Sequence, residues 1–244
     1  IEYLKAIQAQ NAAITPYLIQ RTGDGYHEAA LNSSLSSATA IRKELLSNGW
    51  NDITTLNPYL PEAAYSILKE YLNLYPPVSA NDFSAPLSYL LLQQSEAQLA
   101  FCGDSNEAIA HRIKNLQKQF HSFEQFCQLL KTKDMTYTRI SRIFTHLLLQ
   151  ITKDDYRLGR SLDYIPYLRI LGFRKDASRL LTILSNYASV PMISKTADAY
   201  NFLSSDAAKV FDFDIFAGEL YENILSGITG QDARSEFVRN IVRV

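Results

Sequence analysis

The stretch "SSATAIRKE" at residues 36–44 places hydroxyl side chains and a cation at the start of a predicted helix. Ser37 and Thr39 supply hydroxyl donors, and Arg42 follows within one helical turn. The first turn of a helix presents free backbone amides and the positive end of the helix dipole, so it favours an anion. A guanidinium can bind two phosphate oxygens at once. The same residues also suit a simple helix cap with a solvated arginine, and both interpretations stay open.

A second candidate site is a row of cations on the helix predicted over residues 136–152. One face of this helix is apolar, which predicts that it packs on a core. A separate face carries Arg139, Arg142, His146, Gln150 and Lys153, with Lys131 and Lys133 just upstream. Lysine and arginine neutralise nucleic-acid phosphates, and nearby hydroxyls add contacts. The row therefore suits an RNA backbone, although a solvated charged face remains the alternative.

A third group of cations follows at Arg169, Arg174, Lys175 and Arg179, close to Tyr164 and Tyr167. Together they suit a second wall of an RNA groove, in which the tyrosines stack on unpaired bases. The alternative is a solvated helix start beside tyrosines that pack in the core.

Other chemistry is sparse. The "DFDIF" segment at 212–216 has two carboxylates two residues apart, which a helix points to different faces, so no metal pair is expected there. No Ser-His-Asp or Cys-His arrangement is recognisable. Two cysteines are too few for a disulfide framework or a zinc site and fit a reducing compartment.

The bulk properties are those of an ordinary globular chain. It has 244 residues, 47% hydrophobic and 20% charged, and a net charge of -1, so no global field draws it to nucleic acid or membrane. The longest apolar runs are far too short to span a membrane, and no signal sequence opens the chain. We expect a cytoplasmic protein that contacts no membrane.

The elements that position these residues are mostly helical. One short strand is expected at 16–21 and an extended piece at 190–194. Helices are expected at 1–11, 37–47, 61–75, 84–101, 105–119, 122–132, 136–152, 175–187, 205–226 and 231–242. The sequence thus predicts a mainly α fold.

Three segments resemble one known family. "SATAIR" at 37–42 is similar to an ATP-phosphate element of the HIGH-motif nucleotidyltransferase superfamily. "KTKDMTYTRISRIFTHLLLQI" at 131–151 and "YLRILGFRKDASRLL" at 167–181 resemble two segments of the bacterial tRNA(Met) cytidine acetate ligases within it. The three segments occur in the family's order.

The resemblance implies a role for each group of residues. ATP, with Mg²⁺, would be bound by Arg21, Thr22, Ser37, Thr39 and Arg42. Thr22 stands where the family usually has Ile, so its contact would come from the backbone. Elongator tRNA(Met) would be bound by Lys131, Lys133, Arg139, Arg142, Arg169, Arg174 and Lys175. "DM" at 134–135 replaces the family's usual "RY", which puts the tRNA footprint near Asp134 in doubt.

The family's reaction has two steps. Acetate attacks the α-phosphate of ATP to give acetyl-adenylate and pyrophosphate, and the amine of the wobble cytidine then takes the acetyl group. No catalytic residue is expected in this chain, because the family's H-x-G-H segment does not occur in it.

The resemblance also implies a domain organisation. Residues 1–48 would be the last strand–helix unit of a truncated Rossmann-like α/β nucleotidyltransferase domain, 49–84 a connecting helical segment and 85–244 a tRNA-docking helical domain. Such a portion of the enzyme is expected to be inactive alone. Two alternatives remain: a noncatalytic helical module that binds RNA or protein, and a nucleotidyltransferase with a small-molecule acceptor. The oligomeric state is not predicted.

Overall fold

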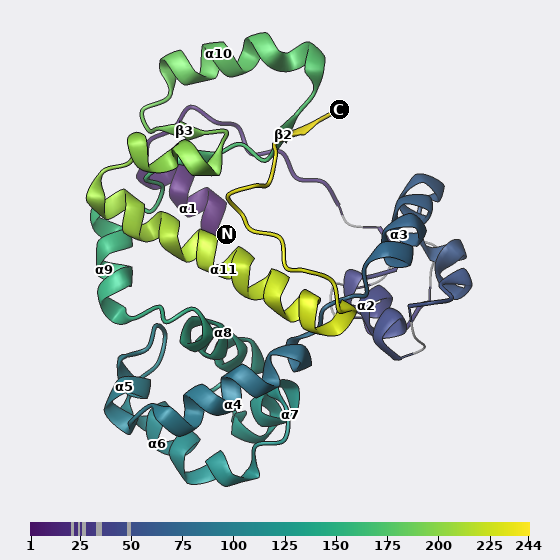
Figure 1. Ribbon diagram of the computed structural model, residues 1–244, viewed down its shortest axis with the longest axis vertical. Coiled ribbons are helices and arrows are strands. Elements are labelled where there is room, and N and C mark those ends of the chain that lie inside the picture. The colour runs from purple at the N-terminus through teal and green to yellow at the C-terminus, as the bar shows by residue number, and fades with distance from the viewer. Residues whose placement is uncertain (21, 24, 26–27, 33–35, 48–49) are drawn as a thin grey trace. The chain divides into compact units, whose positions relative to one another are not determined.

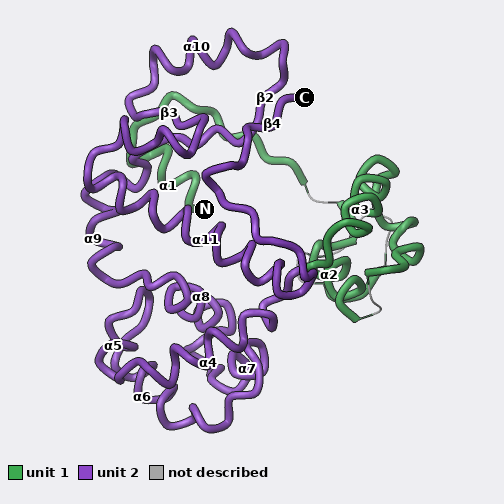
Figure 2. Tube along the Cα trace, viewed as in Figure 1, with its two compact units in different colours: residues 1–77 green, residues 78–244 purple. Residues whose placement is uncertain are grey.

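The computed structural model describes residues 1–244 except 21, 24, 26–27, 33–35 and 48–49. The chain forms two compact units, Ile1–Pro77 and Val78–Val244, which Figure 2 shows in different colours. Figure 1 labels their helices and strands. No helix in the described part of the chain is long and apolar enough to cross a membrane.

The first unit is helical. It contains α1 (Glu2–Ala9), α2 (Ala38–Ser47), the 3-10 helix η1 (Thr54–Tyr59) and α3 (Glu62–Leu74). Leu45 of α2, Ile53, Leu56 of η1 and Leu72 of α3 form a small buried core. This core joins the predicted terminal part of the nucleotidyltransferase domain to the predicted connecting segment. The proposed division at residues 48 and 84 remains a prediction.

The strand predicted at 16–21 is wrong over its described residues. Residues 16–20 form no strand, and Tyr17, Leu18 and Ile19 are each more than four-fifths exposed. A strand is stable only when its backbone pairs with a neighbour, and no described segment pairs with this one. Residues 16–20 are therefore an exposed segment without regular secondary structure.

The second unit begins with a helical bundle, defined here as α4 to α8. Its members are α4 (Ser84–Gln93), α5 (Glu96–Phe101), α6 (Glu107–Leu116), α7 (Phe123–Leu130) and α8 (Tyr137–Leu148), preceded by η2 (Ala80–Phe83), with η3 (Gln117–Gln119) following α6. Phe144 of α8 stacks on Phe126 and meets Phe123 edge-on, and all three are buried. This aromatic core fixes the buried face of α8, as its sequence predicts.

Side-chain caps set the limits of the bundle helices. Asn106, Ser122 and Thr136 each accept the amide hydrogen three residues further on. The helix predicted at 84–101 is divided into α4 and α5, because Ser95 and Gln98 form a reciprocal capping box that begins a new helix.

The remainder of the second unit contains one long helix, α11 (Ser205–Thr229), visible in Figure 1. Before it come α9 (Lys153–Ser161), η4 (Lys175–Ala177), α10 (Ser178–Tyr187) and η5 (Thr196–Asn201). Strand β1 (Leu168–Arg169) pairs in parallel with β3 (Met192–Ile193), and β2 (Gly172–Phe173) with β4 (Val242–Arg243). A second core holds Ile193, Ala199, Phe211 and Ile215.

Two elements of this part differ from the sequence-based expectation. Helix α9 was not predicted, although Thr152 and Asp155 form a capping box at its start. The helix predicted at 231–242 is absent. Gly230, with φ of 70°, ends α11, and in the following segment the Glu236 amide donates to the Glu219 carboxylate on α11. The mainly α fold class is confirmed.

Candidate nucleic-acid interface and phosphate-binding helix

Ser37 caps α2. Its side chain is 1% exposed, its hydroxyl accepts the Ala40 amide hydrogen at 3.1 Å, and it donates to the Glu28 carbonyl. The cap interpretation is therefore confirmed. Both hydrogen-bonding directions of this hydroxyl are in use, so a phosphate contact by Ser37 would have to share it with the cap.

The other predicted ATP contacts differ in accessibility. Arg42 is exposed and makes no ion pair with a described residue, while Thr39 is half-buried one residue into α2. Thr22 is exposed. Arg21 lies outside the described residues. Among the described residues no carboxylate pairs with the Arg42 guanidinium, and the ATP-binding set remains a prediction.

Helix α8 carries what we call the basic stripe, formed by Arg139, Arg142 and His146. The opposite face is anchored by Ile140, Ile143, Phe144 and Leu147, all nearly or fully buried. Successive members of the stripe lie about one turn apart, roughly 5–6 Å along the axis. The sequence placed these side chains correctly on one face.

An acidic turn that the sequence did not predict meets the basic stripe. Arg139 donates to the Asp104 carbonyl at 3.1 Å, and Arg142 forms an ion pair with the Asp104 carboxylate. His146 contacts the Gly103 carbonyl at 3.2 Å. The side chain of Arg142 is still 55% exposed, and each guanidinium has five N–H donors, so both retain donors for a further ligand.

The turn requires glycine at position 103. A Cβ there would lie 2.7 Å from Tyr156 Cε2 and 2.9 Å from His146 Nδ1. Only a residue without a side chain lets the backbone approach these rings. Tyr156 in turn stands edge-on to His146, with ring centroids 5.6 Å apart. The turn and the stripe are therefore one packed assembly.

Lys131 and Lys133 lie in the connection between α7 and α8. Both are exposed, and neither ammonium has an ion pair with a described residue. The connection is closed by Thr132, whose amide donates to the Met135 carbonyl at 3.0 Å and whose hydroxyl accepts the Met135 amide hydrogen at 3.1 Å. The two lysines therefore extend the positive surface beyond the start of α8.

Arg169 belongs to a buried ion network. Its guanidinium pairs with the carboxylate of Glu236 and lies 5.9 Å from the centre of the Phe211 ring. The guanidinium of Arg239 forms ion pairs with two carboxylates. It lies 3.3 Å from that of Glu236 and 2.5 Å from that of Glu222 on α11. The side chains of Arg169 and Glu236 are 20% and 5% exposed. The structure thus engages Arg169 inside the unit, and its predicted tRNA contact remains untested.

The rest of the third cationic group is at the surface. Arg174 forms a two-bond ion pair with Asp176, at 3.1 and 2.6 Å. The side chain of Lys175 is exposed, while its amide donates to the Val244 carbonyl. The four cations are thus not gathered on one surface, because Arg169 alone is drawn into the ion network.

The two tyrosines of this region also differ. Tyr164 is 64% exposed, and its hydroxyl accepts from Arg160. Tyr167 donates to Asp214 at 2.6 Å and packs edge-on against Phe211, so its ring is not free to stack on a base. Burial and the neighbouring carboxylate raise the pKa of Tyr167 well above its usual range.

The "DFDIF" carboxylates serve as acceptors. Asp214 accepts from Tyr167, and Asp212 accepts from Tyr200 at 2.7 Å. Partial burial and this bond raise the pKa of Tyr200 to about 12. Within the described ranges, no three His, Cys, Asp or Glu side chains are grouped to hold a metal ion.

Both cysteines are buried thiols. Burial raises the pKa of Cys102 to about 11 and that of Cys127 to about 12. Neither is available as a thiolate nucleophile near neutral pH.

Comparison with known proteins defines the class. A family model described as HIGH Nucleotidyl Transferase matches residues 1–236. The chain belongs to this family, and the resemblance seen in its sequence is confirmed.

Relatives with a curated name point to one branch of the family. The chain is 33% identical over 223 residues to the tRNA(Met) cytidine acetate ligase of Bacillus velezensis, which covers 90% of this chain and 51% of the relative. It is 29% identical to the enzyme of that name from Bacillus cereus, covering 98% of this chain and 60% of the relative. The chain thus spans between half and three-fifths of the length of these relatives.

Solved structures show the same fold. Apo TmcAL of Thermotoga maritima matches with a TM-score of 0.88 at 20% identity, covering 100% of this chain and 59% of that one. A second crystal form of that protein, bound with alpha-thio ATP, matches with a TM-score of 0.84, also at 20% identity, over 57% of its length.

Proposed function

We propose that this chain is part of an ATP-dependent ligase that activates acetate as acetyl-adenylate and transfers the acetyl group to the wobble cytidine of elongator tRNA(Met). The observation that carries the proposal is the 33% identity over 90% of the chain to a tRNA(Met) cytidine acetate ligase. The exposed cations of the second unit supply the charge that a tRNA partner needs.

The first step requires charge neutralisation and in-line placement more than covalent protein chemistry. A carboxylate oxygen of acetate attacks the α-phosphorus of ATP, and the bond to pyrophosphate breaks. In this proposal the amide end of α2, Thr39 and Arg42 bind phosphate oxygens, with Ser37 holding that end in shape. Arg21 and Thr22 lie against the nucleotide, and the Mg²⁺ ion comes with its phosphates.

The second step requires that the tRNA be docked. The cytidine amine attacks the acetyl carbon, and AMP leaves. In this proposal the basic stripe and Lys131 and Lys133 bind the tRNA backbone, and Arg174 and Lys175 provide a second contact. Arg169 holds together the segment that precedes them. The buried network explains why an arginine of the family-like "YLRILGF" segment is turned inward.

Binding of elongator tRNA(Met) to the chain tests this proposal. We expect wild type to bind, and Arg139→Ala/Arg142→Ala to lose about tenfold or more in affinity, as expected for two lost phosphate contacts. Lys209→Ala is the matched control, because Lys209 is another exposed cation of the second unit that pairs with a carboxylate, that of Asp206. Failure of wild type to bind, or equal binding by the double variant, would contradict the assignment of tRNA to the basic stripe.

A further inference from the structure

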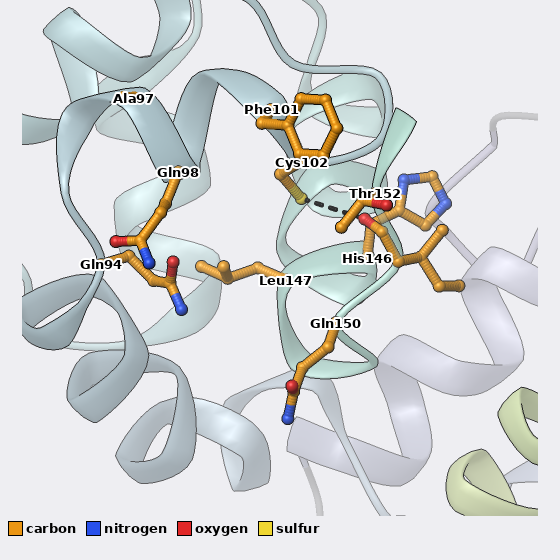
Figure 3. A pocket seen from close by; sticks show the side chains of 10 residues that line it. Gln94, Ala97, Gln98, Phe101, Cys102, His146, Leu147, Gln150 and Thr152 are labelled. Atoms are coloured by element: carbon orange, nitrogen blue, oxygen red, sulfur yellow. Dashed lines mark hydrogen bonds between the residues drawn. The ribbon is translucent and has the colours of Figure 1, made fainter. Parts of the chain in front are cut away.

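A pocket opens beside the basic stripe, where α5 faces the end of α8. Its volume is about 510 Å³, within the range of small-ligand sites. Figure 3 shows the lining side chains, with Phe101 and Cys102 from the end of α5 and Leu147 from α8. Most of the lining is apolar, and three glutamines from α4, α5 and the end of α8 surround it: Gln94, Gln98 and Gln150.

The glutamines retain unused hydrogen-bonding groups. Gln98 accepts the Ser95 amide hydrogen through its carbonyl oxygen, which leaves its NH₂ group as a donor. The side-chain amides of Gln94 and Gln150 bond to none of the described residues. A carboxamide offers two donors and an acceptor with two lone pairs. The pocket thus combines apolar walls, on which a flat ligand can stack, with carboxamides that can form hydrogen bonds to the edge of that ligand.

An aromatic ring is available for that stacking. Phe101 lines the pocket and is 40% exposed, although it is a large apolar side chain. It does not belong to the buried core of the bundle. In Figure 3 its ring lies beside Cys102, whose thiol is near the Ile151 carbonyl at 3.6 Å. The ring is thus accessible to a ligand in the pocket.

The pocket continues directly from the basic stripe. His146 belongs to both, and Arg142 precedes it by four residues on the same face of α8, about 6 Å along the axis. Gln150 follows His146 by four residues. It lies just beyond the end of α8, with φ of 56°, so a cation and an imidazole on α8 are followed by a carboxamide of the pocket.

We propose that this pocket receives an unpaired nucleobase of the bound RNA, while the adjacent phosphate is bound by Arg142. The base stacks on Phe101, and the carboxamides of Gln94, Gln98 and Gln150 bond to its edge. Unpaired RNA bases are recognised by this combination of an aromatic face and amide groups. This inference rests on the proposed RNA-binding function and adds to it a specific site for a base.

Single-stranded RNA hexamers with and without bases provide the test. The probes are oligo(rA), oligo(rC) and oligo(rU) hexamers, and an abasic ribose-phosphate hexamer of the same charge. We expect wild type to bind at least one base-containing hexamer about tenfold more tightly than the abasic one. Phe101→Leu/Gln94→Ala is expected to remove most of this difference and to leave abasic binding unchanged.

Two controls separate this inference from the function on which it rests. Gln93→Ala removes an exposed glutamine next to Gln94 that does not line the pocket, and it should bind as wild type does. Arg139→Ala/Arg142→Ala should weaken binding of all hexamers, abasic included, because it removes phosphate contacts.

The possible results are distinct. If the arginine variant weakens binding but the pocket variant binds intact and abasic RNA as wild type does, the pocket takes no base and the RNA surface stands. That result would favour an apolar side chain of a protein partner in the pocket. If wild type binds none of the hexamers, the base pocket is overturned, whereas the proposed function is overturned only if elongator tRNA(Met) also fails to bind. A pocket variant that loses abasic binding equally would also overturn the base pocket, because its effect would be on the fold.

Discussion

Two groups of arginines look alike in the sequence and have different environments in the structure. Arg139 and Arg142 lie on one face of a helix whose other face is buried, and Arg142 remains 55% exposed although it pairs with Asp104. Arg169 is 20% exposed and pairs with Glu236, which is 5% exposed. The position of the acidic partner determines how exposed each arginine is. Asp104 lies on a surface turn, whereas Glu236 is carried on a segment that folds against α11.

This contrast distinguishes arginines that can bind a ligand from an arginine that stabilises the fold. An exposed ion pair is weak and can exchange its partner for a phosphate, because water screens both charges. A buried pair cannot open without leaving a charge in a poorly solvated place. We therefore expect substitutions of Arg139 and Arg142 to change RNA affinity, and substitution of Arg169 to change the free energy of unfolding.

Arg169→Ala should cause the largest loss of stability. It removes one partner of a buried ion network and leaves the Glu236 carboxylate with Arg239 alone, at a cost of about 3 kcal/mol in the free energy of unfolding. Urea unfolding at neutral pH measures this. A variant as stable as wild type would show that the network contributes little, and Arg169 would then return as a candidate RNA contact.

Gly103→Ala should be the next most damaging change. The added methyl group would lie 2.7 Å from the Tyr156 ring and 2.9 Å from His146, so one of these must move, at a cost of about 1–3 kcal/mol. The same movement should shift Asp104 away from the stripe. Thermal unfolding checks the first effect, and Gly227→Ala is the control, because a Cβ there meets nothing within 4 Å. Equal melting temperatures for the two variants would contradict the packed assembly of turn and stripe.

Asp104→Asn should strengthen RNA binding. It removes the negative charge that competes for Arg142, and asparagine tolerates the backbone conformation at this position, where φ is 61°. We expect affinity for elongator tRNA(Met) to rise about threefold at low salt, as expected from the energy of an exposed pair. Asp134→Asn serves as a second charge removal nearby. If Asp104→Asn weakens binding, the turn is itself part of the RNA site.

Arg174→Ala should have the smallest effect on stability. Its pair with Asp176 is exposed, with the two side chains 73% and 64% accessible, so the free energy of unfolding should change by less than about 0.5 kcal/mol. Urea unfolding beside Arg169→Ala makes the comparison directly. A loss similar to that of Arg169→Ala would remove the distinction between the two kinds of arginine.

The helices of the bundle could be predicted because their signals are local. The apolar spacing of Ile140, Phe144 and Leu147 on α8 specifies both the helix and its buried face. The basic stripe could be predicted too, because the buried face of α8 determines which side chains lie on the opposite face. The pocket, in contrast, has no local signal in the sequence, because Gln94, Phe101 and Gln150 come from separate elements.

The sequence-based predictions were wrong where residues distant in sequence determine the local structure. The segment 231–241 is no helix because Glu219 on α11 accepts the Glu236 amide hydrogen, 17 residues away in sequence. The isolated apolar run at 16–20 suggested a strand, but strand formation depends on a partner that periodicity does not reveal. The ion pair of Arg169 could not be predicted either, because its partner Glu236 is 67 residues further along the chain.

The most direct test of the account is the salt dependence of elongator tRNA(Met) binding by wild type and by Arg139→Ala/Arg142→Ala. Affinity falls with salt in proportion to the number of phosphates neutralised. We predict that the double variant binds more weakly and that its log–log slope is shallower by about two, one for each lost arginine. Identical slopes for the two proteins would show that the basic stripe does not contact phosphates and would contradict the proposed RNA surface.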